Sequence, residues 1–537
     1  MKTLQTMLLE LRSESQSGIV FAEAGKQDEF CAYQDLFQQS LRLLGGLQSL
    51  GVSKGDSVIM QARSNKDTVV LLWACLLGGV VAVPLTCART EDALLKLKNV
   101  ADVLDGAFIV GDEAAMASNE MGFGNAKRIA YSGIDLARPG QLPDRVAESD
   151  VAIIQFSSGT TGIPKGVLLT NKNVASNLES ITLAGKINQL PGVTDSGISW
   201  LPLTNDLGLV GLHFSCVYHN INSIMIEPMS FFYEPTLFFE KIDKYKATVA
   251  INPNFALDYM LGYYSRHKES MGKCDLSSLR LNICGSEPVK PQTVDMFENV
   301  FSVFSLRRNS TLPVYGLAEA CLAVAFSEID TPYITVSLDR NFLAIGDQVQ
   351  ISEDKEKAAT FVSVGKAVPG AHISIRYEKN APAKEGTVGI VHVMGDSVSS
   401  GYANNEEATK ELFSEDGWLN TYDIGVIVDG NLYIVGRQKD MIIIHGKNCY
   451  CIDLEEAIAK SAKVEAAVVN CFNVDTKSDD LYVFVLHEPD DGILAAVKDA
   501  LVKHIGVRVK EVVFRKSFPR TEGGKIRRFL LKQEIQK

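Results

Sequence analysis

The segment SSGTTGIPKG, residues 157–166, gathers small, hydroxyl and cationic side chains in a stretch that suits neither a helix nor a strand. The apolar run VAIIQF precedes it and GVLLT follows it, so it is predicted to connect two strands. Glycines let a turn expose its backbone N–H groups, and hydroxyls and a lysine add further donors, which suits the binding of a polyphosphate. The candidate residues are Ser157, Ser158, Gly159, Thr160, Thr161, Gly162 and Lys165.

This loop is not a Walker A motif, because Gly159 and Gly162 lie three residues apart and a glycine follows Lys165. Taken alone, such a loop is more often an ordinary surface turn. Five further motifs follow it in order, although each alone fits a turn or a helix start. They are CGSEPV (284–289), VYGLAEA (314–320), GWLNTYDIG (417–425), GRQKDMIIIHGKN (436–448) and PRTEGGKIRR (519–528).

Together the six motifs resemble the motif series of adenylate-forming enzymes, the superfamily of acyl-CoA synthetases, firefly luciferase and peptide-synthetase adenylation domains. The resemblance runs from about residue 30 to the C-terminus. It implies ATP and Mg²⁺ as cofactors, with Thr160 and Lys165 orienting the β- and γ-phosphates and Glu319 holding the metal. It also implies an adenine pocket made by Gly285, Ser286, Glu287, Pro288, Tyr315 and Gly316.

The same resemblance implies that Asp423 accepts both ribose hydroxyls, with Arg437 assisting. A carboxylate suits that role because it only accepts hydrogen bonds and can bridge two O–H donors. Lys525 would be catalytic, bridging the substrate carboxylate and the α-phosphate, and Lys439 matches the hinge residue of the family. Since a carboxylate that attacks a phosphate brings like charges together, cations are needed where charge develops in the transition state.

Three stretches resemble the fatty acyl-AMP ligases in particular: SWLPLTNDLGLVG (199–211), INPNFALDYML (251–261) and VYGLAEACLAVAFSEIDTPYITVSLDR (314–340). This implies an additional segment at about 326–362 that restricts the small domain. It also implies transfer of a fatty acyl group to the phosphopantetheine thiol of an acyl or peptidyl carrier protein. An acyl-CoA ligase is the nearest alternative. A noncatalytic nucleotide-binding scaffold is disfavoured by the joint presence of Thr160, Glu319, Asp423, Arg437 and Lys525.

The chain departs from the family pattern at Asn205, where His is frequent, and at Cys284, where Asn is frequent. The stretch GLHFSCVYHN (211–220) lacks the aspartate that amino-acid-activating domains offer to a substrate ammonium, which favours an apolar carboxylic acid as substrate. Ser397 in MGDSVSSGY (394–402) is interpreted as part of a turn rather than as a modified or nucleophilic serine. The histidines and cysteines show no spacing typical of a structural zinc site.

The elements that must position these residues indicate an α/β protein of two or more domains, because 537 residues exceed what one core usually holds. Strands and helices alternate through residues 1–436, which predicts a large N-terminal α/β domain with several subdomains. Residues 437–537 predict a small, mobile α+β domain carrying Lys525. Its helices are expected at 453–461, with Asp453 as N-cap, and at 491–505, ending at Gly506.

Charge and composition exclude some partners and point to a compartment. The formal charge of −12 argues against nonspecific binding to nucleic acid or to an anionic membrane, which needs a basic face. The ten cysteines show no paired spacing, as expected for a reduced cytoplasmic protein. The apolar stretch 69–85 is interpreted as a buried helix and strand divided by Gly78 and Gly79, so no stable membrane insertion is expected. The stretch 352–360 is predicted to be a solvated loop.

Overall fold

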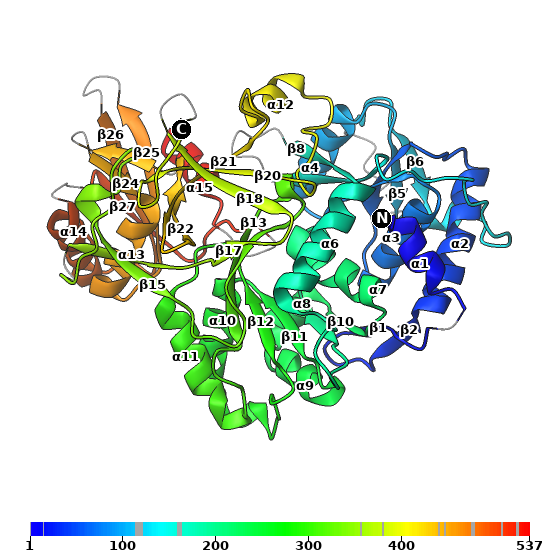
Figure 1. Ribbon diagram of the computed structural model, residues 1–537, viewed down its shortest axis with the longest axis horizontal. Coiled ribbons are helices and arrows are strands. Elements are labelled where there is room, and N and C mark those ends of the chain that lie inside the picture. The colour runs from blue at the N-terminus through cyan, green and yellow to red at the C-terminus, as the bar shows by residue number, and fades with distance from the viewer. Residues whose placement is uncertain are drawn as a thin grey trace. The chain divides into compact units, whose positions relative to one another are not determined.

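The computed structural model describes residues 2–13, 15–112, 122–157, 164–354, 357–377, 381–438, 441–444, 447–473, 478–505, 509–521 and 526–536. The chain forms two compact units (Figure 1). The first unit contains Met1–Tyr333, Ala367–His372 and Val393–Leu419. The second contains Ile334–Lys366, Ile373–His392 and Asn420–Lys537. The domain boundary at residue 436 stays a prediction.

A six-stranded sheet in the first unit carries the predicted phosphate loop. Its order is β6 (Lys127–Ala130), β5 (Phe108–Gly111), β3 (Ser57–Gln61), β4 (Val81–Pro84), β7 (Val151–Ser157) and β8 (Lys165–Thr170). Strands β7 and β8 are antiparallel, and Ser157 pairs with Lys165. The loop therefore connects two adjacent strands, as the sequence predicted.

Helices α2 (Tyr33–Ser49), α3 (Asn65–Leu77) and α4 (Glu91–Val103) belong to the same part of the first unit. Ser64 caps α3 by accepting a hydrogen bond from the backbone N–H of Asp67, and the apolar residues of α3 are buried almost completely. The predicted division of 69–85 into a helix and a strand is confirmed by α3 and β4. No helix among the described residues is both long enough and apolar enough to cross a membrane.

A nine-stranded sheet forms the other large layer of the first unit. Its order is β17 (Lys366–Ala367), β14 (Ala323–Phe326), β13 (Thr311–Gly316), β12 (Leu281–Cys284), β11 (Val249–Asn252), β9 (Gly197–Ser199), β10 (Ser223–Ile226), β1 (Gly18–Ala22) and β2 (Glu29–Ala32). The pairs from β13 through to β1 are parallel. The carboxyl ends of β12 and β13 therefore meet at one edge, where ligands bind in open α/β sheets.

The remaining helices of the first unit connect and cover its strands. They are α1 (Leu4–Glu10), α6 (Asn171–Gly185), a π-helix (Leu207–Phe214) continuing into α7 (Ser215–His219), α8 (Pro228–Tyr233), α9 (Thr236–Tyr245), α10 (Asn254–Arg266), α11 (Pro291–Phe301) and α12 (Glu406–Leu412). Helix α6 begins with a capping box in which Thr170 and Asn173 exchange hydrogen bonds. This cap starts the helix directly after β8.

The second unit contains most of a five-stranded sheet and the small α+β part predicted near the C-terminus. The five-stranded order is β19 (Ala381–Pro382), β18 (Ala371–Tyr377), β20 (Gly389–Gly395), β21 (Leu419–Val428) and β22 (Asn431–Arg437). The C-terminal elements are β23 (Met441–Ile444), β24 (Lys447–Tyr450), α13 (Cys451–Ala462), β25 (Ala466–Asn473), β26 (Ser478–Leu486), α14 (Asp491–Ile505), β27 (Glu511–Arg515) and α15 (Arg528–Gln536). The expected α+β class is thereby confirmed.

Two local predictions in the second unit are wrong. Asp453 is the third residue of α13 rather than its N-cap, because the helix begins at Cys451, where Cys451 and Leu454 are buried in the core. The loop expected over 352–360 ends earlier, since residues 358–360 begin β16 (Ala358–Val362), which pairs with β15 (Thr335–Asp339). The predicted helix end at Gly506 lies outside the described residues.

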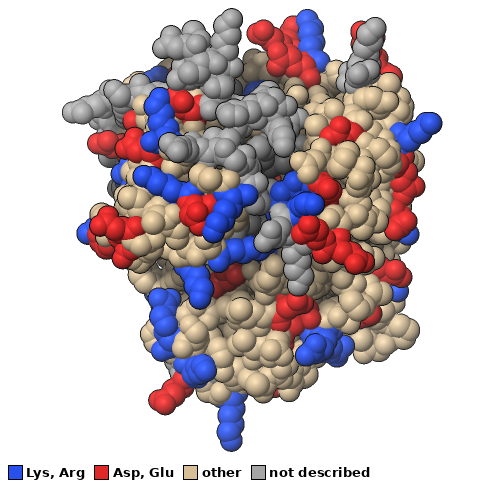
Figure 2. Space-filling view, turned by 90° about the vertical axis from the view of Figure 1, so that its left-hand side faces the viewer, with Lys and Arg blue, Asp and Glu red and all other residues tan. Residues whose placement is uncertain are grey.

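The negative net charge does not make the whole surface acidic. On the face drawn in Figure 2, basic side chains lie beside acidic ones. A net charge of −12 is therefore compatible with local positive regions, because salt screens charges beyond about 8 Å.

Candidate functional site

Glu319, the predicted metal ligand, lies in a short 3₁₀ turn (Ala318–Ala320) directly after β13. Its carboxylate oxygen Oε1 accepts a hydrogen bond of 2.8 Å from the hydroxyl of Tyr402. Its backbone carbonyl accepts a hydrogen bond of 2.8 Å from the backbone N–H of Ser399. The segment around residues 399–402 thus holds both the side chain and the backbone of Glu319.

Lys165, the cation of the predicted phosphate loop, is the first residue of β8 and contacts the same tyrosine. Its Nζ atom lies 4.9 Å from the centroid of the Tyr402 ring, within the range of a cation–π interaction. Tyr402 forms a β-bridge with Val167, and the backbone N–H of Ala403 donates to the carbonyl of Gly166 at 2.7 Å. Lys165 therefore contacts the ring face of Tyr402, and Glu319 contacts its hydroxyl.

The structure describes the two ends of the predicted phosphate loop. The backbone of Ser157 belongs to β7. The residues Ser158, Gly159, Thr160, Thr161 and Gly162 lie outside the described part of the chain, as do Lys439 and Lys525. Their roles stay predictions.

Side chains of helix α6 form hydrogen bonds with the backbone of two segments near Glu319 and Tyr402. Asn173 donates hydrogen bonds of 2.8 Å to the carbonyls of both Asp396 and Val398. Asn177 exchanges hydrogen bonds of 2.9 Å with the backbone of Ala323, a few residues after Glu319. Residues 173 and 177 are one helical turn apart and share a face of α6. Both are buried, so their amide groups exchange water for these backbone partners.

The predicted adenine segment follows β12 and packs closely on β13. A Cβ atom added at Gly285 would lie 2.7 Å from the side chain of Val314, and one at Gly316 would lie 1.8 Å from the carbonyl oxygen of Leu322. Both glycines are therefore required by close packing. Ser286 has a φ angle of 73°, which turns the chain sharply after the strand.

The side chains of this segment are held from several sides. The Glu287 carboxylate accepts a hydrogen bond from the backbone N–H of Phe255, in the first turn of α10. Pro288 follows directly, and Tyr315, the penultimate residue of β13, is almost completely buried. The structure thus gathers residues 285–288 and 315–316 at the carboxyl ends of two adjacent parallel strands.

The two departures from the family pattern have structural partners. Cys284 is fully buried at the end of β12, and burial raises the pKa of its thiol well above the ordinary value. The side-chain oxygen of Asn205 accepts a hydrogen bond of 2.9 Å from the backbone N–H of Leu207, where the π-helix begins. Cys284 is therefore a neutral packing residue, and Asn205 stabilises the start of a helix.

In the second unit, Asp423 and Arg437 lie opposite each other on the antiparallel strands β21 and β22. The Arg437 Nε atom is 3.2 Å from an Asp423 carboxylate oxygen. The Asp423 side chain is 15% exposed and that of Arg437 is 48% exposed. The predicted ribose pair is thus assembled at one end of a two-stranded ladder.

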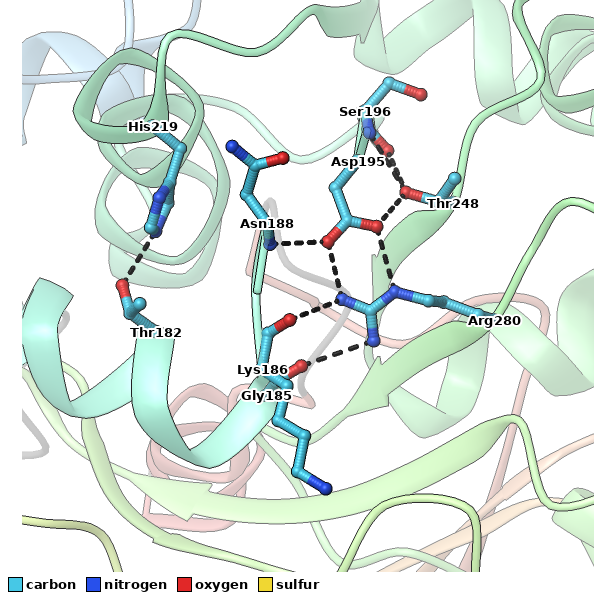
Figure 3. Close-up of polar contacts among 9 residues, drawn as sticks. All are labelled: Thr182, Gly185, Lys186, Asn188, Asp195, Ser196, His219, Thr248 and Arg280. Carbon is cyan, nitrogen blue, oxygen red and sulfur yellow. Dashed lines mark hydrogen bonds and ion pairs between the residues drawn. The ribbon is translucent and has the colours of Figure 1, made fainter. Parts of the chain in front are cut away.

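A buried ion pair holds the other end of α6 to the strands (Figure 3). Arg280 donates to both Asp195 carboxylate oxygens, at 2.9 and 2.6 Å, and to the carbonyls of Gly185 and Lys186 at the end of α6. Burial tends to raise the pKa of Asp195, but hydrogen bonds from Arg280, Asn188 and Thr248 outweigh it and hold this pKa below its ordinary value. Asp195, Arg280, Asn188 and Thr248 together form the anchor cluster.

The donor set around Glu319 fits Mg²⁺. A carboxylate is a hard oxygen ligand, and protein-bound Mg²⁺ commonly uses one or two carboxylates plus waters and substrate phosphates. No group of three or more His, Cys, Asp or Glu side chains gathers as a metal site within the described residues. The Oγ atom of Ser399 is buried and has no hydrogen-bond partner in that part of the chain. A buried hydroxyl on the residue whose backbone N–H donates to Glu319 fits a site that ligand oxygens complete.

Sequence analysis did not identify Tyr402, Asn173 or Asn177 as parts of the site. Tyr402 was present in a segment interpreted only as a turn, and that segment does connect β20 to α12. The available signal for α6 was the pair of asparagines four residues apart, on a helix immediately after the loop.

Comparison with known proteins places these features in a family. Residues 17–403 match the family model of AMP-binding enzymes. The medium-chain-fatty-acid–[acyl-carrier-protein] ligase JamA of Moorena producens is 29% identical, over 97% of this chain and 93% of that protein. A putative acyl-CoA synthetase of Caulobacter vibrioides is 28% identical, over 97% and 93% of the two chains.

A solved structure from work on fatty acyl-adenylate ligases of E. coli and L. pneumophila has the same architecture. It matches with a TM-score of 0.87 and 26% identity, covering all of this chain and 98% of the solved one. The fold and the site thus define an ATP-using α/β ligase that activates an acid as its adenylate. The chain belongs to the AMP-binding enzyme family.

Proposed function

We propose that this protein activates a fatty acid as acyl-AMP and then transfers the acyl group to the phosphopantetheine thiol of a carrier protein. The observation that carries the proposal is the meeting of Lys165, Tyr402 and Glu319, because it joins a phosphate-binding cation to a metal-binding carboxylate. The fatty acyl branch is supported by the similarity to JamA and to fatty acyl-adenylate ligase structures.

Each candidate residue has a role in nucleotide binding under this proposal. Residues 285–288, Tyr315 and Gly316 contact the adenine, and Asp423 accepts the ribose hydroxyls while Arg437 orients its carboxylate. Thr160, Lys165 and the rest of the loop bind the β- and γ-phosphates through backbone N–H groups and hydroxyls. Glu319 holds Mg²⁺, which supplies positive charge to the phosphate oxygens when bound.

In the first half-reaction, a carboxylate oxygen of the acid attacks the α-phosphorus of ATP. The bond from that phosphorus to the bridging oxygen breaks, and pyrophosphate leaves with the electron pair. Lys525 neutralises charge on the attacking carboxylate and on the α-phosphate, which lowers the barrier to bringing the two anions together. In the second half-reaction the carrier thiolate attacks the acyl carbonyl, AMP leaves, and a thioester forms.

The proposal includes the arrangement of the chain. Residues 437–537 act as the mobile domain that brings Lys525 to the reaction, with Lys439 at the hinge. Residues 326–362 act as the additional segment of the fatty acyl-AMP ligase branch. The protein acts in the cytoplasm, where a carboxylic acid, ATP and a separate carrier protein are its partners.

The acceptor distinguishes this function from its nearest alternative, an acyl-CoA ligase, and the Caulobacter relative is named as a putative acyl-CoA synthetase. The decisive experiment offers a panel of aliphatic, aromatic and hydroxylated acids with ATP and Mg²⁺, followed by free CoA or a phosphopantetheinylated carrier. Mass spectrometry of the products identifies both the acid and the acceptor. Acyl-carrier thioester without acyl-CoA is the expected result, and the reverse would establish the CoA ligase instead.

A further inference from the structure

We infer that Tyr402 is a positioning residue that keeps the Lys165 ammonium and the Glu319 carboxylate oriented but separate, so that both charges remain available to Mg²⁺ and to phosphate. The inference rests on the proposed function, because it concerns the same nucleotide site. It goes further because Tyr402 lies outside all six sequence motifs and has no role in the proposed nucleotide contacts.

Tyr402 contacts the two charged groups through different parts of its side chain. The hydroxyl donates to Glu319 at 2.8 Å, whereas the face of the ring lies 4.9 Å from the Lys165 ammonium. A cation over a ring face is attracted by the aromatic quadrupole. A phenol that donates to a carboxylate fixes its direction without cancelling its charge. One side chain therefore holds an anion and a cation at once.

Both charged groups contact Tyr402, so removing its side chain frees the Lys165 ammonium and the Glu319 carboxylate to approach each other. A lysine and a carboxylate that close to about 4 Å or less form an ion pair, and in a partly buried place the pair attracts strongly. Such a pair would have to be broken before either group could bind its ligand. The contacts that Lys165 and Glu319 make with Tyr402 are weaker than such an ion pair. Mg²⁺ or phosphate therefore displaces them at a lower cost in free energy.

The placement of Tyr402 is itself well determined. It forms the bridge with Val167, and its backbone N–H donates to the Thr409 hydroxyl at 3.0 Å. The preceding Gly401 has a φ angle of 126°, and an added Cβ would lie 2.3 Å from the Thr409 side chain. Asn173 of α6 clamps the carbonyls of Asp396 and Val398 just upstream. These backbone contacts fix the position of the Tyr402 side chain.

The test compares Tyr402→Phe with Tyr245→Phe. The Tyr245 hydroxyl donates to the Asp28 carboxylate at 2.7 Å, so the control removes the same kind of bond away from Glu319. ATP binding is measured by calorimetry over a Mg²⁺ series in the wild type and both variants. Loss of one hydrogen bond to a charged group corresponds to roughly a tenfold change or more.

Tyr402→Phe is expected to raise the half-saturating Mg²⁺ concentration by about tenfold, while Tyr245→Phe matches the wild type. Tyr402→Leu, which also removes the ring, is expected to weaken MgATP binding further. Thr409→Val removes the acceptor of the Tyr402 backbone N–H, together with the hydrogen bond from the Thr409 hydroxyl to the Asn405 carbonyl, and should shift the Mg²⁺ dependence in the same direction by less. It also serves as the test if Tyr402→Phe does not fold.

An unchanged Mg²⁺ dependence in Tyr402→Phe and Thr409→Val would overturn the inference. Acid-dependent pyrophosphate exchange is measured in parallel. If the wild type binds MgATP but shows no exchange with any acid, the proposed function fails, whereas the role of Tyr402 is still decided by the binding series. If the wild type binds no MgATP, both are wrong.

Discussion

Two carboxylates of the first unit, Glu319 and Asp195, are held in opposite ways. Asp195 is completely buried and receives donors from Arg280, Asn188 and Thr248. In the described part of the chain, the hydrogen bond to the Glu319 carboxylate comes from the neutral hydroxyl of Tyr402. The charge of Asp195 is therefore compensated by the protein, whereas that of Glu319 remains available to a cation.

The difference shows how one scaffold separates stability from chemistry. The anchor cluster fastens the end of α6 to strands β9, β11 and β12, and α6 in turn clamps the segments that carry Glu319 and Tyr402. A saturated ion pair suits an anchor because its partners satisfy one another. An unsaturated carboxylate suits a binding site because its ligand completes it.

The largest effect is expected from Asp195→Asn, which leaves the Arg280 charge buried without its anion. Removing one partner of a buried ion pair typically costs about 3–5 kcal/mol. We expect that loss in the free energy of unfolding, measured by urea denaturation. The activity per folded molecule should stay within a few-fold of the wild type. A large loss of activity without a loss of stability would contradict the division drawn here.

Glu319→Gln is expected to show the reverse pattern. It preserves size and can still accept a hydrogen bond from Tyr402, but it removes the charge. Loss of one preorganised electrostatic group typically costs 10²–10³ in rate, or roughly 2.7–4 kcal/mol. We expect acid-dependent pyrophosphate exchange to fall by that order, with a urea midpoint close to that of the wild type. A strong destabilisation would mean that Glu319 is an anchor as well.

Asp423→Asn sharpens the comparison with a third carboxylate, which is paired with the half-exposed Arg437. Solvent screens this pair on the half-exposed Arg437 side, so the free energy of unfolding should fall by less than it does for Asp195→Asn. Loss of a charged acceptor for ribose hydroxyls should raise the KM for ATP by roughly tenfold or more. The matched control is 2′-deoxy-ATP, for which the variant and the wild type should differ less.

The smallest effect concerns acid stability. Because the pKa of Asp195 is lower in the folded protein than the ordinary aspartate value of 3.8, its stabilisation is fully present above that value. It is lost as the pH falls through the lowered folded pKa. Urea midpoints between pH 3 and pH 7 should therefore converge for the wild type and Asp195→Asn at the acid end. Parallel curves would show that ionisation of Asp195 contributes nothing.

Sequence analysis was most successful where a local pattern carries the information. The strands on each side of the phosphate loop, the helix and strand in 69–85 and the helices α13 and α14 were predicted because apolar runs and turn residues are adjacent in the chain. It failed at Asp453 and at residues 358–360. There, burial of Cys451 and Ala359 in tertiary cores extended elements beyond their local signals.

The contacts that assemble the site were not predictable in the same way. The partners of Asn173 are backbone carbonyls more than two hundred residues away, and a carbonyl has no residue type that a motif could record. Tyr402 is positioned by its β-bridge with Val167 of β8. Its role in the site therefore depends on a neighbouring strand and not on its own segment.

The sequence by itself determined which chemistry is available: a hydroxyl- and glycine-rich loop, a lysine, and carboxylates at the ends of predicted strands. Those properties belong to residue types and short spacings. The tertiary structure decided which of these groups meet, which carboxylate is compensated and which is left for a ligand. Those outcomes depend on burial and on long-range hydrogen bonds, which exist only once the sheets and α6 have packed.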